Sequence, residues 1–264
     1  MATKTIEVTA SNYFSKEANR AYMSVSQFKA FSKCEFAALE EVNGNYSRAE
    51  STALLVGSYV DAYFEGTLDL FVAQHPEIKK RDGTLKADYV QAELIIERLK
   101  ADPLFMEYMS GEKQVIFTGV IEGIDCKCKV DSFHAGRMIV DLKVMRDFKP
   151  VYLPGEGRLN FIEAWRYDLQ GAVYQELVFQ NTGKRLPFYI AGATKEVSTD
   201  LEIFEIPQEV MDAQLEVFKA DVRRFQFIKE GLIEPERCGH CEVCRQTKKL
   251  VRPTTWEELN NYEL

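Results

Sequence analysis

The sequence predicts a mixed α/β fold of the α+β kind, in which helices flank a central mixed β-sheet. Changes in hydrophobic period along the chain predict it. Helical spacing of apolar residues comes first, strict alternation follows, and helices and strands then succeed one another. The expected helices cover 24–43, 50–65, 86–101, 161–180 and a stretch from Pro207 to about 230. The expected strands cover 114–122, 124–133, 137–145, 187–194 and 200–206.

Most of the expected helices also carry a start or stop signal. Ser24, with Gln27 three positions on, fits a capping box at the start of the first helix, which we expect to break near Ser32. Gly66 would stop the second helix, because glycine readily adopts the left-handed conformation of a helix C-cap. The third helix depends on its apolar spacing alone, and Pro207 suits the first position of the last one.

Length and composition favour one globular domain spanning 1–264. The chain has 264 residues, 46% of them hydrophobic, with 33 basic and 41 acidic side chains and a net charge of −8. These values exclude the disordered, collagen-like and low-complexity classes. No apolar run approaches the ~20 residues of a membrane helix, and no signal sequence is visible, so we expect a cytoplasmic protein without a membrane partner. The acidic balance argues against broad coating by nucleic acid but permits a local basic groove.

Three charged side chains are expected to meet in the middle of the sheet. Alternation makes Asp141 and Lys143 project together, about 7 Å apart along their strand. The connection at 134–136 is short enough for a hairpin, which would bring Asp131 close to Asp141. Two adjacent carboxylates repel each other unless a divalent cation lies between them, and oxygen ligands suit Mg²⁺ or Mn²⁺. The alternative is a half-exposed sheet face that carries charges for solubility.

The segments around these residues resemble the core motif of the PD-(D/E)XK nuclease superfamily. Val-Asp-Ser-Phe at 130–133 and Ile-Val-Asp-Leu-Lys at 139–143 carry the resemblance. The segment 123–131 is also similar to phage exonucleases of the RecE type, the exodeoxyribonuclease VIII group. The resemblance covers about 22–250, and it implies a restriction-endonuclease-like core that hydrolyses DNA.

Two helical motifs resemble the RecB-like branch of the same superfamily. Gly-Ser-Tyr-Val-Asp at 57–61 is similar to its Gly-x-x-x-His motif, with Asp61 in the place of histidine. Aspartate can also bind a hard cation. Tyr167, Gln170 and Tyr174 resemble its Tyr-x-x-Gln-x-x-x-Tyr motif and share one helical face. Their neutral donors would hold a DNA phosphate or the attacking water, whereas ordinary packing is the alternative for this stripe.

The resemblance implies a role for each polar residue of the expected site. The implied metal ligands are Asp61, Asp131, Asp141 and the Leu142 backbone carbonyl, with Glu112 as a further candidate. The implied catalytic residues are Asp131, Asp141, Lys143, Gln170, Tyr167 and Tyr174, with Lys143 orienting the water that attacks a phosphodiester. Lys127 and Lys129 would contact DNA, because alternation places them on the strand face that carries Asp131.

The cysteines near the C-terminal end have the spacing of a metal site. Cys238, Cys241 and Cys244 form a CxxCxxC run, in which three thiolates can hold one metal centre. Cys34 is the candidate fourth ligand. The segment 26–39 around it resembles the first-cysteine segment of AddB-type nucleases, which implies a [4Fe–4S] cluster.

That cluster would join the N-terminal helices at about 22–45 to the Cys-rich segment at about 235–252. Zinc is the alternative metal, and His240 could then replace Cys34 as the fourth ligand. Cys126 and Cys128 differ from the other four, because they alternate onto an apolar strand face. We expect those two thiols to be buried and free of metal.

The sequence as a whole predicts a metal-dependent deoxyribonuclease. The resemblance implies an exonuclease that acts on linear double-stranded DNA in phage-type recombination or DNA processing. A single-strand annealing protein and further copies of the chain are the candidate protein partners. A non-catalytic DNA-binding or recombination-partner module, stabilised by a Cys–metal site, is the alternative, and metal-dependent cleavage of linear DNA separates the two. A zinc-binding interaction module is the third interpretation.

Overall fold

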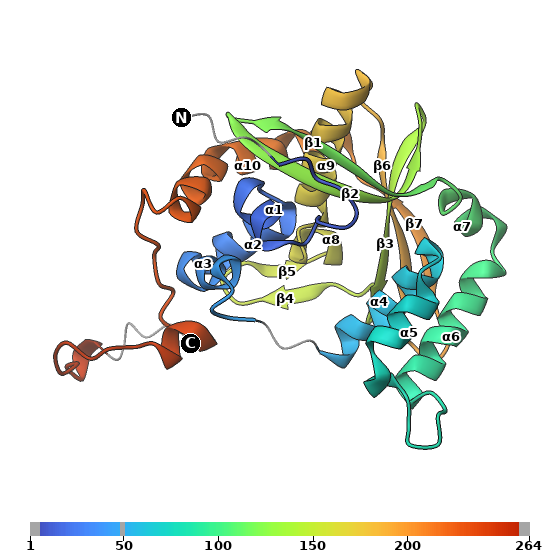
Figure 1. Cartoon of the computed structure of the whole chain (residues 1–264), viewed down its shortest axis with the longest axis horizontal. Helices are drawn as coiled ribbons and strands as arrows, with labels where there is room; N and C mark the ends of the chain where they lie inside the picture. The colour runs from blue at the N-terminus through green and yellow to red at the C-terminus, as the bar shows by residue number, and fades with distance from the viewer. Residues whose placement is uncertain (1–5, 48–50, 259–264) are drawn as a thin grey trace.

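The computed structural model describes residues 6–47 and 51–258, and a five-stranded mixed β-sheet forms its centre (Figure 1). Its strands are β1 (Glu112–Ile121), β2 (Ile124–His134), β3 (Met138–Met145), β6 (Phe188–Thr194) and β7 (Leu201–Glu205), in the order β1-β2-β3-β6-β7. β3 and β6 run parallel, and the other neighbours are antiparallel. All five overlap predicted strands, and the mixed α+β fold class is confirmed.

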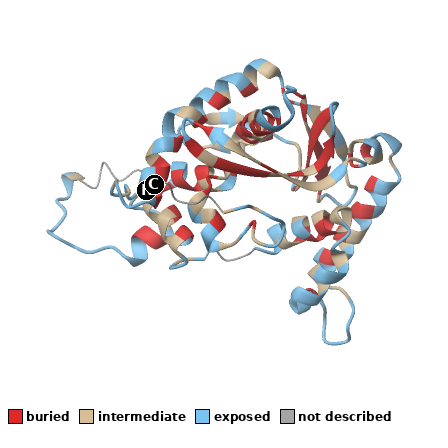
Figure 2. Ribbon diagram, turned by 45° about the horizontal axis from the view of Figure 1, so that its top comes forward, coloured by how far each residue is buried: buried red, intermediate tan, exposed pale blue. Residues whose placement is uncertain are grey.

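Helices cover both faces of this sheet. One face packs against α2 (Val25–Lys33), α3 (Glu35–Asn43), α9 (Tyr167–Thr182) and α10 (Gln208–Lys229). The other face packs against α4 (Thr52–Glu65), α6 (Ala87–Lys100) and α7 (Pro103–Tyr108). Figure 2 shows the buried residues of the strands between these layers. Ile139 joins the first core and Val140 the second, because successive strand residues point to opposite faces.

Several short elements complete the chain. They are α1 (Lys16–Ala21), α5 (Leu68–Gln74), the 3₁₀ turn η1 (Pro76–Ile78), β4 (Val151–Leu153), β5 (Gly157–Leu159), α8 (Phe161–Ala164) and α11 (Glu242–Gln246). Of these, only α8 lies inside a predicted helix. Elements this short contain too few residues to display a hydrophobic period. Among the described residues, no helix combines the length and the apolar character that a membrane crossing would need.

The predicted start of the first helix and the predicted end of the second helix are confirmed, but the first helix breaks at a different residue than expected. The Ser24 side chain accepts a hydrogen bond from the Gln27 backbone N–H, and Gly66 ends α4 with a φ of 75°. Residue 50, where the second helix was expected to begin, lies outside the described residues. The break in the first helix falls at Cys34 rather than near Ser32, since Cys34 is extended and caps both α2 and α3.

The prediction of one helix over 161–180 is wrong, because two helices occupy this stretch. Arg166 adopts the left-handed conformation, with a φ of 54°, and separates α8 from α9. A complete capping box between Asn160 and Glu163 favours α8 as a separate one-turn helix. The interruption leaves the Trp165 carbonyl outside either helix, where it accepts a hydrogen bond from a lysine of α2.

Candidate active site

The Asp131 carboxylate lies where β2 and β3 separate. The antiparallel pairing of the two strands ends at Ser132 and Val140, so Asp131 and Asp141 would form the next opposed pair. Asp131 Oδ2 instead accepts a hydrogen bond from the Leu142 backbone N–H at 2.9 Å. A side-chain carboxylate thus takes the place of a backbone acceptor in the ladder. The predicted hairpin is present, and it opens at the two carboxylates that it was expected to bring together.

Asp141 is buried and contacts two polar side chains. Lys143 Nζ forms an ion pair with Asp141 Oδ2, and Gln170 Nε2 donates a hydrogen bond to Oδ1 at 2.6 Å. Lys143 Nζ also donates to the Leu142 carbonyl at 3.3 Å. Burial opposes the charge of Lys143, but Asp141 and Asp131 outweigh it and raise the pKa of this lysine. The ammonium therefore contacts two groups that were expected to bind metal.

Helix α4 adds a third carboxylate, that of Asp61. Burial and the negative charges of Asp131 and Asp141 raise the pKa of Asp61 well above its usual range, although Lys143 opposes the shift. Burial and Asp141 likewise raise the pKa of Asp131 to about 7, against the opposing effects of Lys143 and the Leu142 N–H. A bound cation would favour the ionised forms of these mutually repelling groups.

The three carboxylates line an open cleft of about 630 Å³, which α9 borders with Tyr167, Gln170 and Tyr174. The three residues of the helical motif thus share one face of α9, as their spacing predicted, and that face borders the cleft. Gln170 binds Asp141, so its amide holds a carboxylate rather than a phosphate or a water. Lys143 Nζ lies 5.4 Å from the centre of the Tyr167 ring, which is a cation–π distance. Burial raises the pKa of Tyr174, so its hydroxyl remains a neutral donor.

Gln114 occupies the cleft position for which the sequence suggested Glu112. Glu112 is exposed at the start of β1 and does not line the cleft, so the structure does not support it as a ligand. Gln114 Nε2 donates to Asp131 Oδ1 at 3.2 Å, and Gln114 Oε1 is buried without a partner. The two-residue turn at 122–123 sets this register, and it is the sequence signal that could have identified Gln114.

A second lysine, Lys29 of α2, lines the cleft, although no sequence motif indicates it. Lys29 Nζ donates to the Trp165 carbonyl at 3.0 Å and lies 5.2 Å from the centre of the Tyr167 ring. Burial and the nearby charge of Lys143 lower the pKa of Lys29 to about 7. No local pattern could have identified Lys29, because only the packing of α2 against α9 brings it here.

The structure contradicts the expectation that Lys127 contacts DNA. Lys127 is 1% exposed, and its ammonium donates hydrogen bonds to the Tyr13 carbonyl and to Asn19 Oδ1. The N-terminal segment covers this part of β2, because Met23 pairs with Cys126 beside the strand. Lys129, by contrast, lines the cleft, as the DNA-binding prediction requires.

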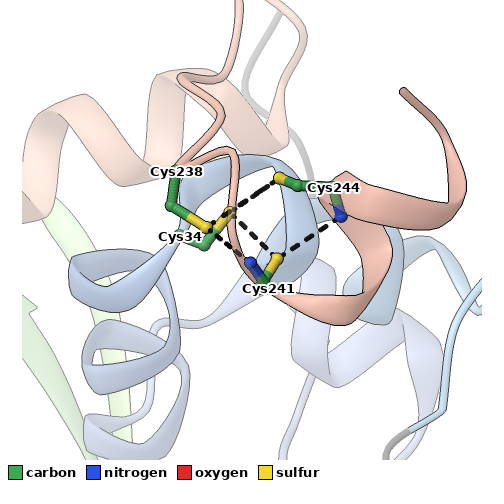
Figure 3. Close-up of side chains that lie close together, drawn as sticks. All are labelled: Cys34, Cys238, Cys241 and Cys244. Atoms are coloured by element: carbon green, nitrogen blue, oxygen red, sulfur yellow. Dashed lines mark hydrogen bonds between the residues drawn. The ribbon is translucent and has the colours of Figure 1, made fainter. Parts of the chain in front are cut away.

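The four cysteines at the chain ends lie together (Figure 3), and none of them lines the cleft. The sulfurs of Cys34, Cys238, Cys241 and Cys244 all lie within 4.8 Å of one another. In the described part of the chain, no three carboxylates or histidines have ligand atoms that all lie within this distance of one another. The carboxylate oxygens of the cleft are therefore farther apart than the four sulfurs. His240 is exposed and outside the cluster, which selects Cys34 as the fourth member. Cys126 and Cys128 are fully buried in the core, as predicted.

The environment of the cluster favours ionisation of one of its sulfurs. Burial works against the Cys238 thiolate, but backbone N–H groups of Cys241 and His240 outweigh it and lower its pKa to about 6. Burial raises the pKa of Cys241 to about 12 and raises that of Cys34 as well. A metal that binds here must therefore displace protons from the other thiols, which makes its affinity dependent on pH.

We expect the affinity of the cleft for a divalent cation to fall as the pH drops below about 7. Asp131 must be ionised to bind metal, and its pKa near 7 lets protons compete below that pH. Titration of the protein with Mn²⁺ should show affinity up to about tenfold lower at pH 6 than at pH 8 for each proton displaced. Equal affinities at the two pH values would contradict the assignment of Asp131 as a ligand.

The raised pKa of Asp131 also determines how the stability of the protein changes with pH when no divalent metal is bound. A carboxyl whose pKa is raised holds its proton in the folded state at pH values where the unfolded chain has lost it. The contribution of Asp131 to the free energy of unfolding therefore falls as pH rises from about 4 to about 7. Asp131→Asn, measured in a chelator, should remove this part of the pH dependence.

Comparison with known proteins agrees with this architecture. The sequence model of a family described as "PDDEXK-like domain of unknown function" matches residues 24–247. A crystal structure of a "Putative exonuclease" from Eubacterium rectale is similar to the chain with a TM-score of 0.93 and 45% sequence identity, over 98% of this chain and 100% of that one. No curated protein matches the chain. The chain belongs to the family of PDDEXK-like domains, as the resemblance of its core motif implied.

Proposed function

We propose that this chain is a metal-dependent deoxyribonuclease that degrades linear DNA from its ends. The observation that carries the proposal is the cleft in which Asp131, Asp141 and Lys143 meet at diverging strands. Membership of the PDDEXK-like family supports a nuclease. Similarity to the Eubacterium rectale protein, which is described as a "Putative exonuclease", supports action at DNA ends.

The donor groups of the cleft fit a hard divalent cation. Asp61, Asp131 and Asp141 offer carboxylate oxygens, and the buried Gln114 Oε1 has no other partner. With the Leu142 carbonyl, these are the oxygen donors that Mg²⁺ and Mn²⁺ prefer. Such a cation, when bound, polarises a phosphoryl oxygen and lowers the pKa of a coordinated water.

The residues of the chain would orient the nucleophile and the phosphate. The raised pKa of Lys143 keeps its ammonium charged at neutral pH, so it can donate to the attacking water or to a phosphate oxygen. Asp141 and the Tyr167 ring hold that ammonium in place, and Gln170 fixes the orientation of Asp141. Tyr174 supplies a neutral donor on the same wall, and Lys129 supplies positive charge for the DNA backbone.

Incubation with Mg²⁺ and an end-labelled linear duplex, beside a covalently closed circle, tests the proposal. We expect the linear DNA to be degraded and the circle to persist, with all cleavage lost in EDTA. Degradation of the circle would replace exonuclease by endonuclease action. Binding of both DNAs without cleavage of either would overturn the enzymatic proposal and favour a DNA-binding module.

We expect Asp61→Ala to lose most cleavage activity, by about ten- to a hundredfold, whereas Asp61→His should keep measurable activity. An imidazole can replace a carboxylate as a ligand and binds Mn²⁺ better than Mg²⁺, so the rescue by histidine should be stronger in Mn²⁺. Asp69→Ala is the matched control, because Asp69 is an exposed aspartate of α5 that does not line the cleft. Wild-type activity of Asp61→Ala would show that Asp61 is not a ligand.

We also propose that the four cysteines hold one structural metal centre that joins the two ends of a single nuclease domain. Four thiolates suit either Zn²⁺ or a [4Fe–4S] cluster. The resemblance to AddB-type nucleases supports the cluster. The sulfur separations of 3.6, 3.8 and 4.0 Å support zinc, because a tetrahedron of Zn–S bonds has edges of ~3.8 Å. Iron and acid-labile sulfide in an anaerobic preparation would establish the cluster, and one zinc per chain would exclude it.

A further inference from the structure

An aromatic ring stands exposed at the rim of the catalytic cleft. Phe14 is 73% exposed, yet it lines the cleft that holds the carboxylates. It also lines an adjoining cavity of about 270 Å³, so there is open space beside the ring. A large apolar side chain in this position loses the benefit of burial. Its setting resembles the base-stacking platforms by which proteins hold unpaired nucleotides.

Hydrogen bonds to its own backbone and to that of Tyr13 fix the position of Phe14. Asn19 Nδ2 donates to the Phe14 carbonyl at 3.2 Å, and the ammonium of Lys127 donates to the carbonyl of Tyr13. The buried Tyr13 ring packs edge-on against the Phe14 ring, with centroids 4.9 Å apart. Lys127 therefore anchors the segment that presents Phe14, which gives this buried lysine a structural role.

A cation lies beside the exposed ring. Lys129 Nζ is 5.2 Å from the centre of the Phe14 ring. Lys129 precedes Asp131 by two residues on β2 and lines the same cleft, so the two Cα atoms are separated by about 7 Å along the strand. The Phe14 ring and the Lys129 ammonium, which suit a base and a phosphate, thus lie two residues along β2 from Asp131, a predicted metal ligand.

We propose that Phe14 and Lys129 form a subsite for the nucleotide next to the scissile phosphate, in which the base stacks on Phe14 and the phosphate contacts Lys129. The inference rests on the proposed nuclease function and adds a substrate requirement to it. A base that stacks on Phe14 cannot remain stacked in a duplex, so the cleft would select an unpaired nucleotide at a strand end. Stacking tolerates any base, so the subsite should show little sequence preference.

Phe14→Ala should lower kcat/KM on linear DNA by between about 5- and 150-fold, the range that base–aromatic stacking spans. Phe14→Trp should retain most of the activity, because indole also stacks. Phe179→Ala is the matched control, because Phe179 is also a partly exposed ring beside a cation but does not line the cleft. The Arg185 guanidinium carbon lies 5.5 Å from the centre of the Phe179 ring. Wild-type kcat/KM for Phe14→Ala, in a preparation whose wild type cleaves DNA, would overturn this inference and leave the nuclease proposal intact.

An abasic terminal nucleotide, placed at each DNA end in turn, tests whether the ring acts on a base. At one of the two ends, the abasic nucleotide should lower wild-type kcat/KM about as much as Phe14→Ala does. Combining the abasic substrate with Phe14→Ala should then lower kcat/KM little further. Fully additive losses at both ends would overturn the stacking.

A binding measurement separates this inference from catalysis. With Asp141→Ala as background, a terminal 2-aminopurine should be quenched on binding when Phe14 is present and should stay bright in Phe14→Ala. Equal quenching in the two proteins would overturn the inference, whereas absence of DNA binding and cleavage in wild type would instead count against the proposed function.

Discussion

Replacing either Asp141 or Lys143 by alanine should abolish DNA cleavage, with a loss of about a thousandfold or more in kcat. Asp141 is a proposed metal ligand, and its carboxylate also holds the ammonium of Lys143. Lys143 in turn contacts the Leu142 carbonyl and lies against the Tyr167 ring. Each substitution therefore removes its own group and releases the other one from its position. End-label release in Mg²⁺ and in Mn²⁺ measures the effect.

The control for this pair is Lys149→Ala. Lys149 is an exposed lysine whose ammonium lies 3.8 Å from Glu196, so the change removes a charge pair outside the cleft. Exposed pairs of this kind contribute between about 0 and 1 kcal/mol to stability, and activity should not change. Near-wild-type cleavage by Asp141→Ala or Lys143→Ala, with far-ultraviolet circular dichroism unchanged, would reject the site.

The sheet could be predicted because its strands alternate, but alternation does not reveal what covers each face. The residues 124–131 alternate regularly, and this pattern placed Lys127 and Lys129 on one polar face. Lys129 does line the cleft, whereas Lys127 is buried beneath the segment that contains Tyr13 and Asn19. That contact joins residues more than 100 positions apart, and no short-range pattern encodes it.

The candidate site shows the same division between local and tertiary information. Asp131 and Asp141 could be matched because a short connection fixes their register, and the turn at 122–123 would have matched Gln114 to Asp131 by the same reasoning. Lys29 could not be found in this way. It reaches the cleft through the packing of α2 on α9, at a point where Arg166 interrupts the helix that the period predicted.

Cys34→Ser should lower the metal content of the protein. It should also lower the free energy of unfolding by about 3–5 kcal/mol, which corresponds to about 10 °C in Tm. Cys34 and Cys238 are 204 positions apart, so a centre that binds both greatly restricts the unfolded chain. Glu35 is expected to limit the damage. It accepts hydrogen bonds from Arg224 and from the Glu236 backbone N–H, and these hold the two ends together without any metal.

Cys128→Ala is the control, because Cys128 is a fully buried thiol of β2 outside the cluster. It should lose some stability by leaving a small cavity but keep the full metal content. Cleavage per folded molecule should survive in Cys34→Ser at low temperature, since none of the four cysteines lines the cleft. Full metal occupancy in Cys34→Ser would remove Cys34 from the centre and transfer its role to His240. Loss of cleavage at a temperature where the variant is still folded would show that the centre also shapes the cleft, through α2 and its Lys29.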